Sequence, residues 1–199
     1  MPRPSMKDQR SEEILDAYLT CVARFGLEGA TQERIAAEAG VKRPLLRHYL
    51  GNKDQMIDAL ADHVISSFDL ASDVIGAELA VLDTPQDLVA MLFTDRGAHD
   101  PRYLLAWQAL AIAVADHQHM REPLLASMQR FLTMLQDTLA RIVPSAPTVQ
   151  INAVAQGISA LFINADSFTP LGPPATWRAE TQEAAMLLAS TLTPHTPEA

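Results

Sequence analysis

Cationic side chains gather in one short stretch of the sequence, which offers the clearest chemistry. Lys42, Arg43 and Arg47 fall on the outward face of a short helix expected over 43–50, and Lys53 begins the next helix. Guanidinium and ammonium groups in the major groove of DNA pair with guanine O6 and N7. We therefore interpret this stretch as a surface that reads double-stranded DNA. The alternative is an ordinary solvated polar face.

The residue types suggest different roles within this surface. We expect Lys42, Arg43 and Arg47 to read base edges, and Pro44 and Leu45 to contact thymine methyl groups. The expected phosphate contacts are Thr31, Gln32, His48, Tyr49 and Lys53. Lys53 stands at a helix N-terminus, where amide donors and the helix dipole favour an anion. For Tyr49 the alternative is a place in the core, since aromatic residues at helical spacing are often buried.

The net charge of −9 argues at first against a nucleic-acid partner, but its distribution reverses that interpretation. Residues 1–56 hold 9 Lys and Arg against 8 Asp and Glu, whereas residues 57–199 hold 6 against 16. All three lysines, Lys7, Lys42 and Lys53, lie in the first segment. This asymmetry suggests an anion-facing head on an acidic body, although so small a positive balance also arises by chance.

Two short helices must position these side chains. Ile35 and Ala39 lie four residues apart on one helical face, and Gly40 supplies a residue that turns with positive φ. Leu46 and Tyr49 give the second helix its inward face. The pattern predicts a helix-turn-helix. Because the second helix is too short to be stable alone, we expect the motif to pack on a helix over 9–25 through Ile14, Leu15, Tyr18, Val22 and Phe25.

The rest of the chain is also expected to be helical, which makes the fold class all-α. Alanine and leucine dominate, and proline and glycine supply the breaks. The expected helices span 9–25, 32–39, 43–50, 53–81, 85–96, 101–117, 121–142, 148–168 and 176–192. The expected N-caps are Thr31, Asn52, Thr84, Asp100 and Thr148. Residues 169–176 are expected to form a loop, and 193–199 a disordered tail.

The stretch from Ile14 to about Ala61 resembles the TetR family of transcriptional regulators. The resemblance rests on Phe25-Gly26, on Gly29-Ala30-Thr31, on the run from Ile35 to Val41, and on Leu46, His48-Tyr49, Lys53 and Met56-Ile57. It implies an N-terminal DNA-binding domain over residues 1–52 and a helical ligand-binding and dimerisation domain over 53–199. It further implies a homodimer on a palindromic operator, most simply a repressor released by a small effector; activation is the alternative. Lys42, Pro44, Leu45 and Arg47 depart from the family's usual residues, so the operator sequence does not carry over.

The effector site is expected in the second domain. The candidate lining residues are large, soft or aromatic: Met91, Tyr103, Trp107, Met128, Phe131 and Phe162. Such groups suit an apolar or amphipathic molecule, with Tyr103 and Trp107 offering polar tips. The alternative for each is plain core packing, and the family resemblance is the reason to favour a pocket.

The dimer face is expected on helices 148–168 and 176–192. Small residues at spacings of four, three and four form a strip on the first of these helices, and Leu188 lies in a stripe on the second; the candidates are Ala153, Gly157, Ala160, Asn164 and Leu188. Small strips let another helix approach closely. The alternative is that both faces are covered within one subunit.

Other functions find little support. No Ser, His and Asp constellation or glycine-rich phosphate loop suggests an enzyme, and no cofactor is expected. The pair His117 and His119 is expected to decorate the surface and not to bind metal, and the single cysteine, Cys21, to be buried and inert, with a redox sensor as the alternative. The longest apolar run, 103–115, is too short to span a membrane, and residues 1–10 lack an apolar signal region. We therefore expect a cytoplasmic protein without a membrane partner. A dimer whose head no longer reads DNA is the remaining alternative.

Overall fold

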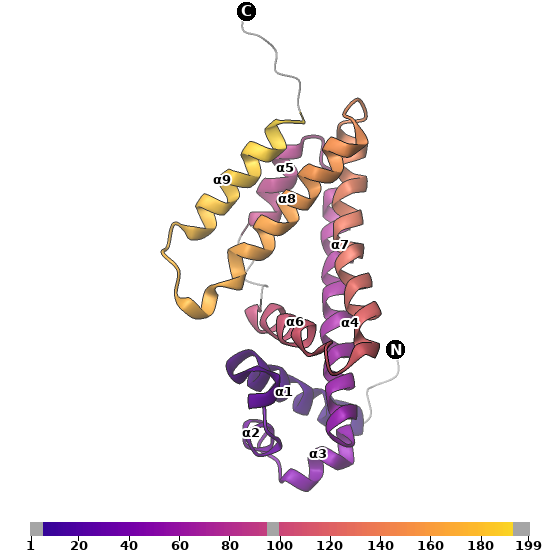
Figure 1. Ribbon diagram of the computed structural model, residues 1–199, viewed down its shortest axis with the longest axis vertical. Coiled ribbons are helices and arrows are strands. Elements are labelled where there is room, and N and C mark those ends of the chain that lie inside the picture. Colours follow the sequence, from indigo (N-terminus) through magenta and orange to yellow (C-terminus); the bar gives the residue numbers. More distant parts are fainter. Residues whose placement is uncertain (1–5, 95–99, 193–199) are drawn as a thin grey trace, which may run out of the picture. The chain divides into compact units, whose positions relative to one another are not determined.

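The computed structural model describes residues 6–94 and 100–192, and these residues contain helices and no strand. In chain order the helices are α1 (Met6–Gly29), α2 (Gln32–Glu38), α3 (Arg43–Leu50), α4 (Lys53–Leu79), α5 (Pro85–Phe93), α6 (Pro101–Ala113), η1 (Gln118–Met120), α7 (Arg121–Ile142), α8 (Thr148–Ser167), η2 (Thr169–Leu171) and α9 (Trp177–Ser190) (Figure 1). The predicted all-α class is confirmed. The tail expected to be disordered, 193–199, lies outside the described residues.

The helices pack into two compact units. The head unit comprises the chain up to Phe68 together with Arg102–Ala126, and the body unit comprises Asp69–Pro101 and the chain from Ser127 onward. The head unit therefore extends beyond residue 52, because the first half of α4 contributes Met56, Ile57 and Leu60 to the same core as α1. The division of roles at residues 52 and 53 stays a prediction.

The head unit is built on α1, which packs against α2 and α3 (Figure 1). Of the residues expected to join these helices, Ile14, Tyr18 and Val22 are buried, and Leu15 packs partly against the core. Phe25 was expected there too, and that prediction is wrong because its side chain is 43% exposed. Its ring lies against the guanidinium groups of Arg24 and Arg34, at 5.2 and 4.5 Å from the ring centroid.

Helix N-caps follow the sequence at three of the predicted positions. Thr31 and Thr84 accept hydrogen bonds from the backbone N–H groups of Arg34 and Asp87, and Asn52 accepts one from Gln55. Side-chain acceptors at these positions satisfy amides that the helix leaves unpaired. The expectation for Thr148 is wrong: Pro147 is the N-cap, in an extended conformation, and Thr148 is already helical. Helix α6 begins at Pro101, directly after the predicted cap Asp100.

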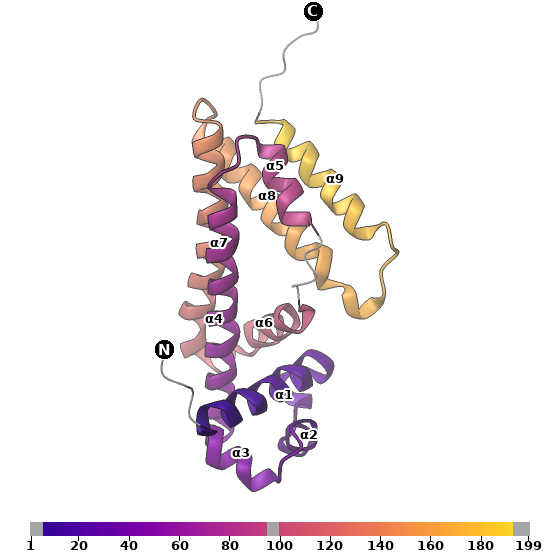
Figure 2. The ribbon, with the colours of Figure 1, turned by 180° about the vertical axis from the view of Figure 1, so that it is seen from behind.

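In the body unit, α9 packs along α8 and α5 (Figure 2). The core of this unit includes Leu88, Leu135, Leu139, Ile158 and Ala185, all with no exposed surface. Arg141 donates from Nη2 to the carbonyl oxygens of Leu79, the last residue of α4, and of Leu82 in the following turn, at 2.9 and 3.0 Å. None of the helices in the described ranges has the length and apolar character that a membrane crossing needs.

Candidate nucleic-acid interface

A tight turn joins the two helices of the predicted motif. Gly40 has φ of 62°, a conformation that glycine adopts at little cost. The N–H of Val41 donates to the carbonyl of Ala36 at 2.9 Å and closes the turn, and α3 then starts at Arg43. Leu46 and Leu50 are buried in the head unit. The predicted helix-turn-helix is confirmed in its helices and in the glycine that turns the chain.

The outward face of α3 is exposed as its sequence predicts. The exposed residues are Lys42, Arg43, Pro44, Leu45, Arg47 and His48. Pro44 lies in the first helical turn, where its missing N–H has no helical partner to lose. Tyr49 is half-buried, packs against the core, and meets the ring of His48 edge-on at 5.0 Å between centroids. The ring of Tyr49 therefore packs partly in the core, as the alternative interpretation expected, while part of its side chain remains exposed to solvent.

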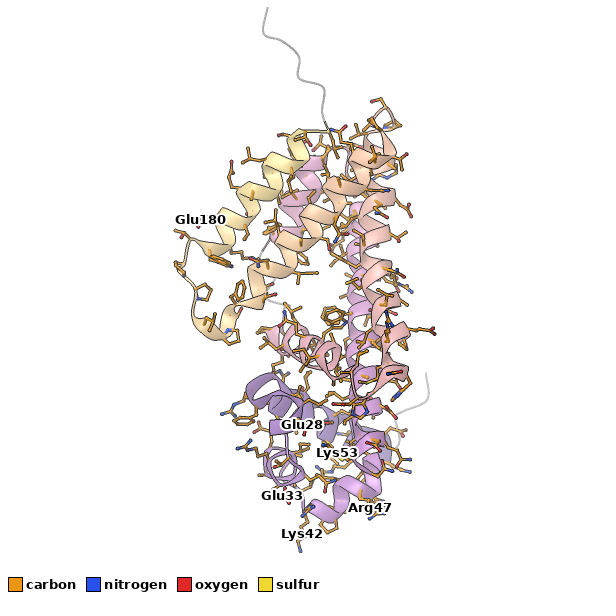
Figure 3. All side chains as sticks on the ribbon, viewed as in Figure 1. Glu28, Glu33, Lys42, Arg47, Lys53 and Glu180 are labelled. Atoms are coloured by element: carbon orange, nitrogen blue, oxygen red, sulfur yellow. The ribbon has the colours of Figure 1, made fainter. Side chains whose placement is uncertain are left out.

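Two of the four cations are paired with acidic side chains in the free protein. Nη1 of Arg43 lies 2.7 Å from Oε1 of Glu33, and Nε of Arg43 donates to Oε1 of Gln32 at 3.1 Å. Nζ of Lys53 donates to Oε2 of Glu28 at 3.4 Å. Within the described ranges, Lys42 and Arg47 form no ion pair; Figure 3 shows both at the edge of the head unit. The face therefore offers two unpaired and two paired cations to an anion.

Three of the expected phosphate contacts, Thr31, Gln32 and Lys53, lie around the first turns of α2 and α4, whereas His48 and Tyr49 lie in α3. A hollow of about 210 Å³ is lined by residues that include Thr31, Gln32, Arg43 and Lys53, and by the buried Met56. Asn52 and Gln55 hold the first turn of α4 through reciprocal hydrogen bonds of 2.9 Å between each backbone N–H and the other's side-chain oxygen. This capping box fixes the backbone from which Lys53 projects.

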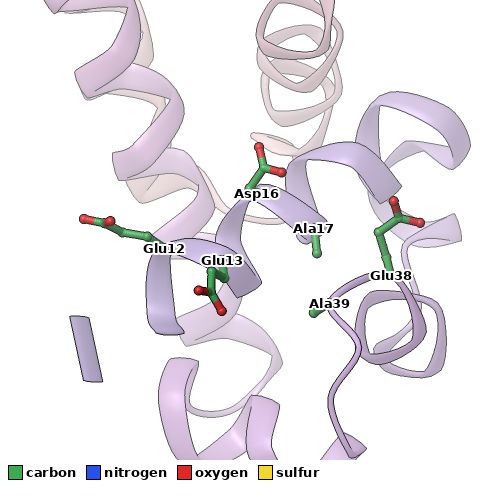
Figure 4. Close-up of a pocket in the computed structure, with 6 residues that line it drawn as sticks. All are labelled: Glu12, Glu13, Asp16, Ala17, Glu38 and Ala39. Atoms are coloured by element: carbon green, nitrogen blue, oxygen red, sulfur yellow. The ribbon is translucent and has the colours of Figure 1, made fainter. Parts of the chain in front are cut away.

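A second hollow in the head unit has the opposite charge. It measures about 530 Å³ and is lined by Glu12, Glu13 and Asp16 of α1 and by Glu38 of α2, as Figure 4 shows, together with Ala17 and Ala39. Its carboxylates would repel a phosphate backbone, so this side of the head unit does not suit DNA. This acidic hollow was not predicted from the sequence, although acidic residues at 12, 13 and 16 on one helix were a visible signal.

The six predicted effector residues divide between the two units. Tyr103 and Trp107 pack partly against the head core, where the hydroxyl of Tyr103 lies 3.2 Å from Nε2 of His63. Burial lowers the pKa of His63 from its ordinary value, which favours a neutral ring there. In the body unit Phe131 stacks on Phe162 with centroids 5.9 Å apart, Met91 is half-buried and Met128 is 42% exposed. An effector pocket lined by these residues stays a prediction.

The five predicted dimer residues differ in exposure. Ala153 and Ala160 of α8 are exposed, whereas Gly157 faces α9: a Cβ added at Gly157 would lie 2.6 Å from Cδ1 of Leu188. The helix that approaches closely at Gly157 is therefore α9 of the same chain. The backbone oxygen of Asn164 also accepts a hydrogen bond within the chain, from Nε1 of Trp177 at 3.5 Å. A dimer face at Ala153 and Ala160 stays a prediction.

The remaining candidate groups are the two histidines near η1 and the single cysteine. Nε2 of His119 lies 2.7 Å from Oδ1 of Asp58, and the ring of His117 meets that of His119 edge-on. Across the described ranges no three His, Cys, Asp or Glu side chains are grouped as metal ligands. Cys21 is buried, and burial raises the pKa of its thiol, which disfavours the reactive thiolate.

Comparison with known proteins finds relatives of this helix-turn-helix. Residues 14–60 match the profile of the bacterial regulatory proteins of the tetR family. A curated relative, the HTH-type transcriptional regulator BetI of Burkholderia lata, is 28% identical over 167 residues, which cover 81% of this chain and 82% of BetI.

Solved structures share the fold over nearly the whole chain. The ketosteroid regulator KstR2 of Mycobacterium tuberculosis superposes with a TM-score of 0.69 at 20% identity, covering 94% of this chain and 96% of KstR2. FadR of Bacillus subtilis, in complex with stearoyl-CoA, superposes with a TM-score of 0.62 at 15% identity, covering 90% and 97%. Together with the helix-turn-helix and its exposed cationic helix, these likenesses show that residues 14–60 are similar to the DNA-binding domain of the tetR regulatory proteins and that the chain has the same fold as the solved regulators.

Proposed function

We propose that this protein is a ligand-responsive repressor that binds a palindromic operator as a homodimer. The observation that carries the proposal is the outward face of α3, where Lys42, Arg43 and Arg47 are exposed on a helix anchored by the buried Leu46 and Leu50. Short helices anchored in this way enter the major groove and read base edges. Thr31, Gln32, His48, Tyr49 and Lys53 are the proposed phosphate contacts, and Pro44 and Leu45 the apolar ones.

A dimer would place two such heads on successive major grooves, about 34–36 Å apart. The proposed dimer face runs along α8, where Val149, Ala153 and Ala160 are exposed on one helical face, and along α9, where Leu187 is 62% exposed. Removal of such an apolar stripe from water by a second subunit lowers the free energy and therefore favours the dimer.

The proposed effector is apolar or amphipathic. Its supports are the partly buried side chains of Tyr103 and Trp107, which pack against the core of the head unit. FadR of B. subtilis, which has the same fold, holds stearoyl-CoA, so this architecture accommodates an amphipathic molecule. Binding that favours a head spacing unsuited to DNA would lower operator affinity about 5- to 150-fold, for a coupling of about 1–3 kcal/mol. We expect a cytoplasmic protein without catalytic activity, as this role requires.

The decisive experiment is a search for sequence-preferring DNA binding. The full chain is incubated with a pool of random duplexes, bound DNA is enriched and sequenced, and affinities for the enriched duplex and a scrambled one are compared at several salt concentrations. We expect a palindrome and an affinity that falls steeply with salt. An Arg43→Ala, Arg47→Ala double variant should lose the preference. A folded wild-type chain that enriches no sequence would contradict the proposal.

The effector proposal has its own readout. Trp107 and Trp177 are the two tryptophans, so a Trp177→Phe variant reports on Trp107 alone. Amphipathic ligands such as long-chain acyl-CoA and steroids should change its fluorescence and release the enriched duplex. Ligands that change neither signal across such a panel would contradict an effector site near Trp107.

A further inference from the structure

The guanidinium group of Arg43 is held from two sides by the preceding helix. Glu33 and Gln32, in the first turn of α2, place their Oε1 atoms 2.7 Å from Nη1 and 3.1 Å from Nε of Arg43. Gln32 is itself held, because its amide nitrogen lies 3.9 Å from the sulfur of Met56, a side chain that is only 2% exposed. A chain of contacts thus runs from the head core through Gln32 to an exposed cation on α3.

These contacts leave the outer part of the guanidinium available. An arginine side chain carries five N–H donors in a rigid planar fork and reads guanine through two parallel hydrogen bonds. Gln32 engages Nε and Glu33 lies beside Nη1, so the donors of Nη2 face neither of these α2 oxygens. A planar group held at both Nε and Nη1 retains few orientations, which reduces the entropy lost when its remaining donors meet a base.

We propose that Gln32 and Glu33 are positioning residues that orient Arg43 for base reading, so that α2 sets sequence preference without touching a base. The inference rests on the proposed DNA-binding function and deepens it. It also gives Gln32 a role different from the phosphate contact expected from the sequence, because both ends of its amide are used within the chain.

The second ion pair supplies a matched control. Glu28 pairs with Lys53 as Glu33 pairs with Arg43, but an ammonium group facing phosphates is a point charge that needs no particular orientation. Replacing either glutamate by glutamine removes one negative charge near the DNA-facing surface. Both replacements should therefore raise affinity for all duplexes, and only the one at Glu33 should also change which duplexes are preferred.

The test compares Glu33→Gln, Gln32→Ala, Glu28→Gln and Arg43→Ala in the full-length protein, using a panel of single-base variants of the enriched duplex. Glu33→Gln and Gln32→Ala should weaken discrimination about two- to fivefold, the size expected for an exposed pair, at the same base positions that Arg43→Ala affects. Neither should change discrimination further in the Arg43→Ala background. Urea unfolding of each variant checks that the head remains folded.

Three outcomes would overturn the inference: a Glu33→Gln profile that only shifts uniformly, as in Glu28→Gln; changes at positions that Arg43→Ala leaves alone; or an effect that persists without Arg43. A wild-type chain without any preferred duplex would instead reject the proposed function itself. The two failures are therefore distinguishable.

Discussion

The capping box at the start of α4 provides a prediction whose size follows from its geometry. The backbone N–H of Gln55 donates to Oδ1 of Asn52, and the backbone N–H of Asn52 donates to Oε1 of Gln55, both at 2.9 Å. Asn52→Ala removes the first bond and leaves the Gln55 N–H without its acceptor. Loss of an N-cap costs about 0.5–2 kcal/mol. Because both residues are exposed, water takes over the freed group, and we expect a cost near 1 kcal/mol.

A loss of this size lowers the folding equilibrium constant about fivefold and the Tm by about 2–4 °C for a chain of this length. It also acts on DNA binding, because the capped turn presents Lys53. Fraying of that turn should weaken binding to all duplexes alike and leave the order of preference unchanged, as expected for a phosphate contact.

The assay is urea unfolding followed by far-UV circular dichroism, with DNA binding measured on the same samples. Asn52→Ser is the matched control: serine keeps an acceptor at the N-cap, so its stability should stay within about 0.5 kcal/mol of wild type. If Asn52→Ser lost as much stability as Asn52→Ala, or if Asn52→Ala lost none, the cap would not be the source of the stabilisation.

Three further predictions address the interface, the dimer and pH. Arg47→Ala should weaken the free energy of operator binding by about 1–3 kcal/mol and relax the sequence preference at one position in each half-site. Lys53→Ala should instead weaken binding to all duplexes alike and lower the salt dependence of binding by about one per lost contact. Binding measured at several salt concentrations separates the two, and an Arg47→Ala variant with a lowered salt dependence and an unchanged preference would make Arg47 a phosphate contact. Ala160→Arg should give folded monomers by sedimentation, because this side chain is exposed within the subunit, and a wild-type monomer at micromolar concentration would contradict the dimer face. The lowered pKa of His63, caused by burial and opposed by Asp16 and Glu12, means that the unfolded chain binds more protons below the ordinary value of 6.5, so the free energy of unfolding should fall as pH drops below 6.5. His63→Gln should reduce that slope in urea titrations; an equal slope in both proteins would place its cause elsewhere.

The helices could be predicted because their signals are local. Apolar spacing, N-caps and prolines lie within each helix, and α3 and α7 have the predicted bounds. The wrong predictions concern Phe25 and Thr148, where the local sequence is compatible with more than one arrangement. Phe25 precedes Gly26, whose φ of 69° interrupts α1, and its ring is covered by two arginines instead of by the core. The prediction that Thr148 is an N-cap was wrong, because Pro147 already has the extended conformation of an N-cap and the helix begins at Thr148.

The candidate site could be predicted only as a set of residue types. Exposure of Lys42, Arg43 and Arg47 follows from the buried positions of Leu46 and Leu50 on the same helix. The acidic partners could not be inferred in this way, since Glu33 and Arg43 lie on different helices and meet only through the angle between α2 and α3. Gly157 shows the same limit: its small size predicted a close helix, and only packing shows that Leu188 of the same chain approaches it.

The net charge of the head unit does not by itself predict its attraction for DNA, because two of its exposed cations are paired with carboxylates. A positive balance of one over residues 1–56 suggests weak attraction, yet Lys42 and Arg47 form no ion pair in the described ranges while Glu28 and Glu33 engage Lys53 and Arg43. Unpaired cations attract any phosphate backbone. The charge of a paired cation is partly neutralised by its carboxylate, so the net gain from a phosphate is smaller. We expect Arg43 to gain most from a correctly placed guanine, because Gln32 and Glu33 already orient its remaining donors toward one position. We therefore expect Glu28 and Glu33 to lower affinity for DNA in general more than affinity for the preferred sequence, so that their presence beside α3 favours discrimination over tight binding.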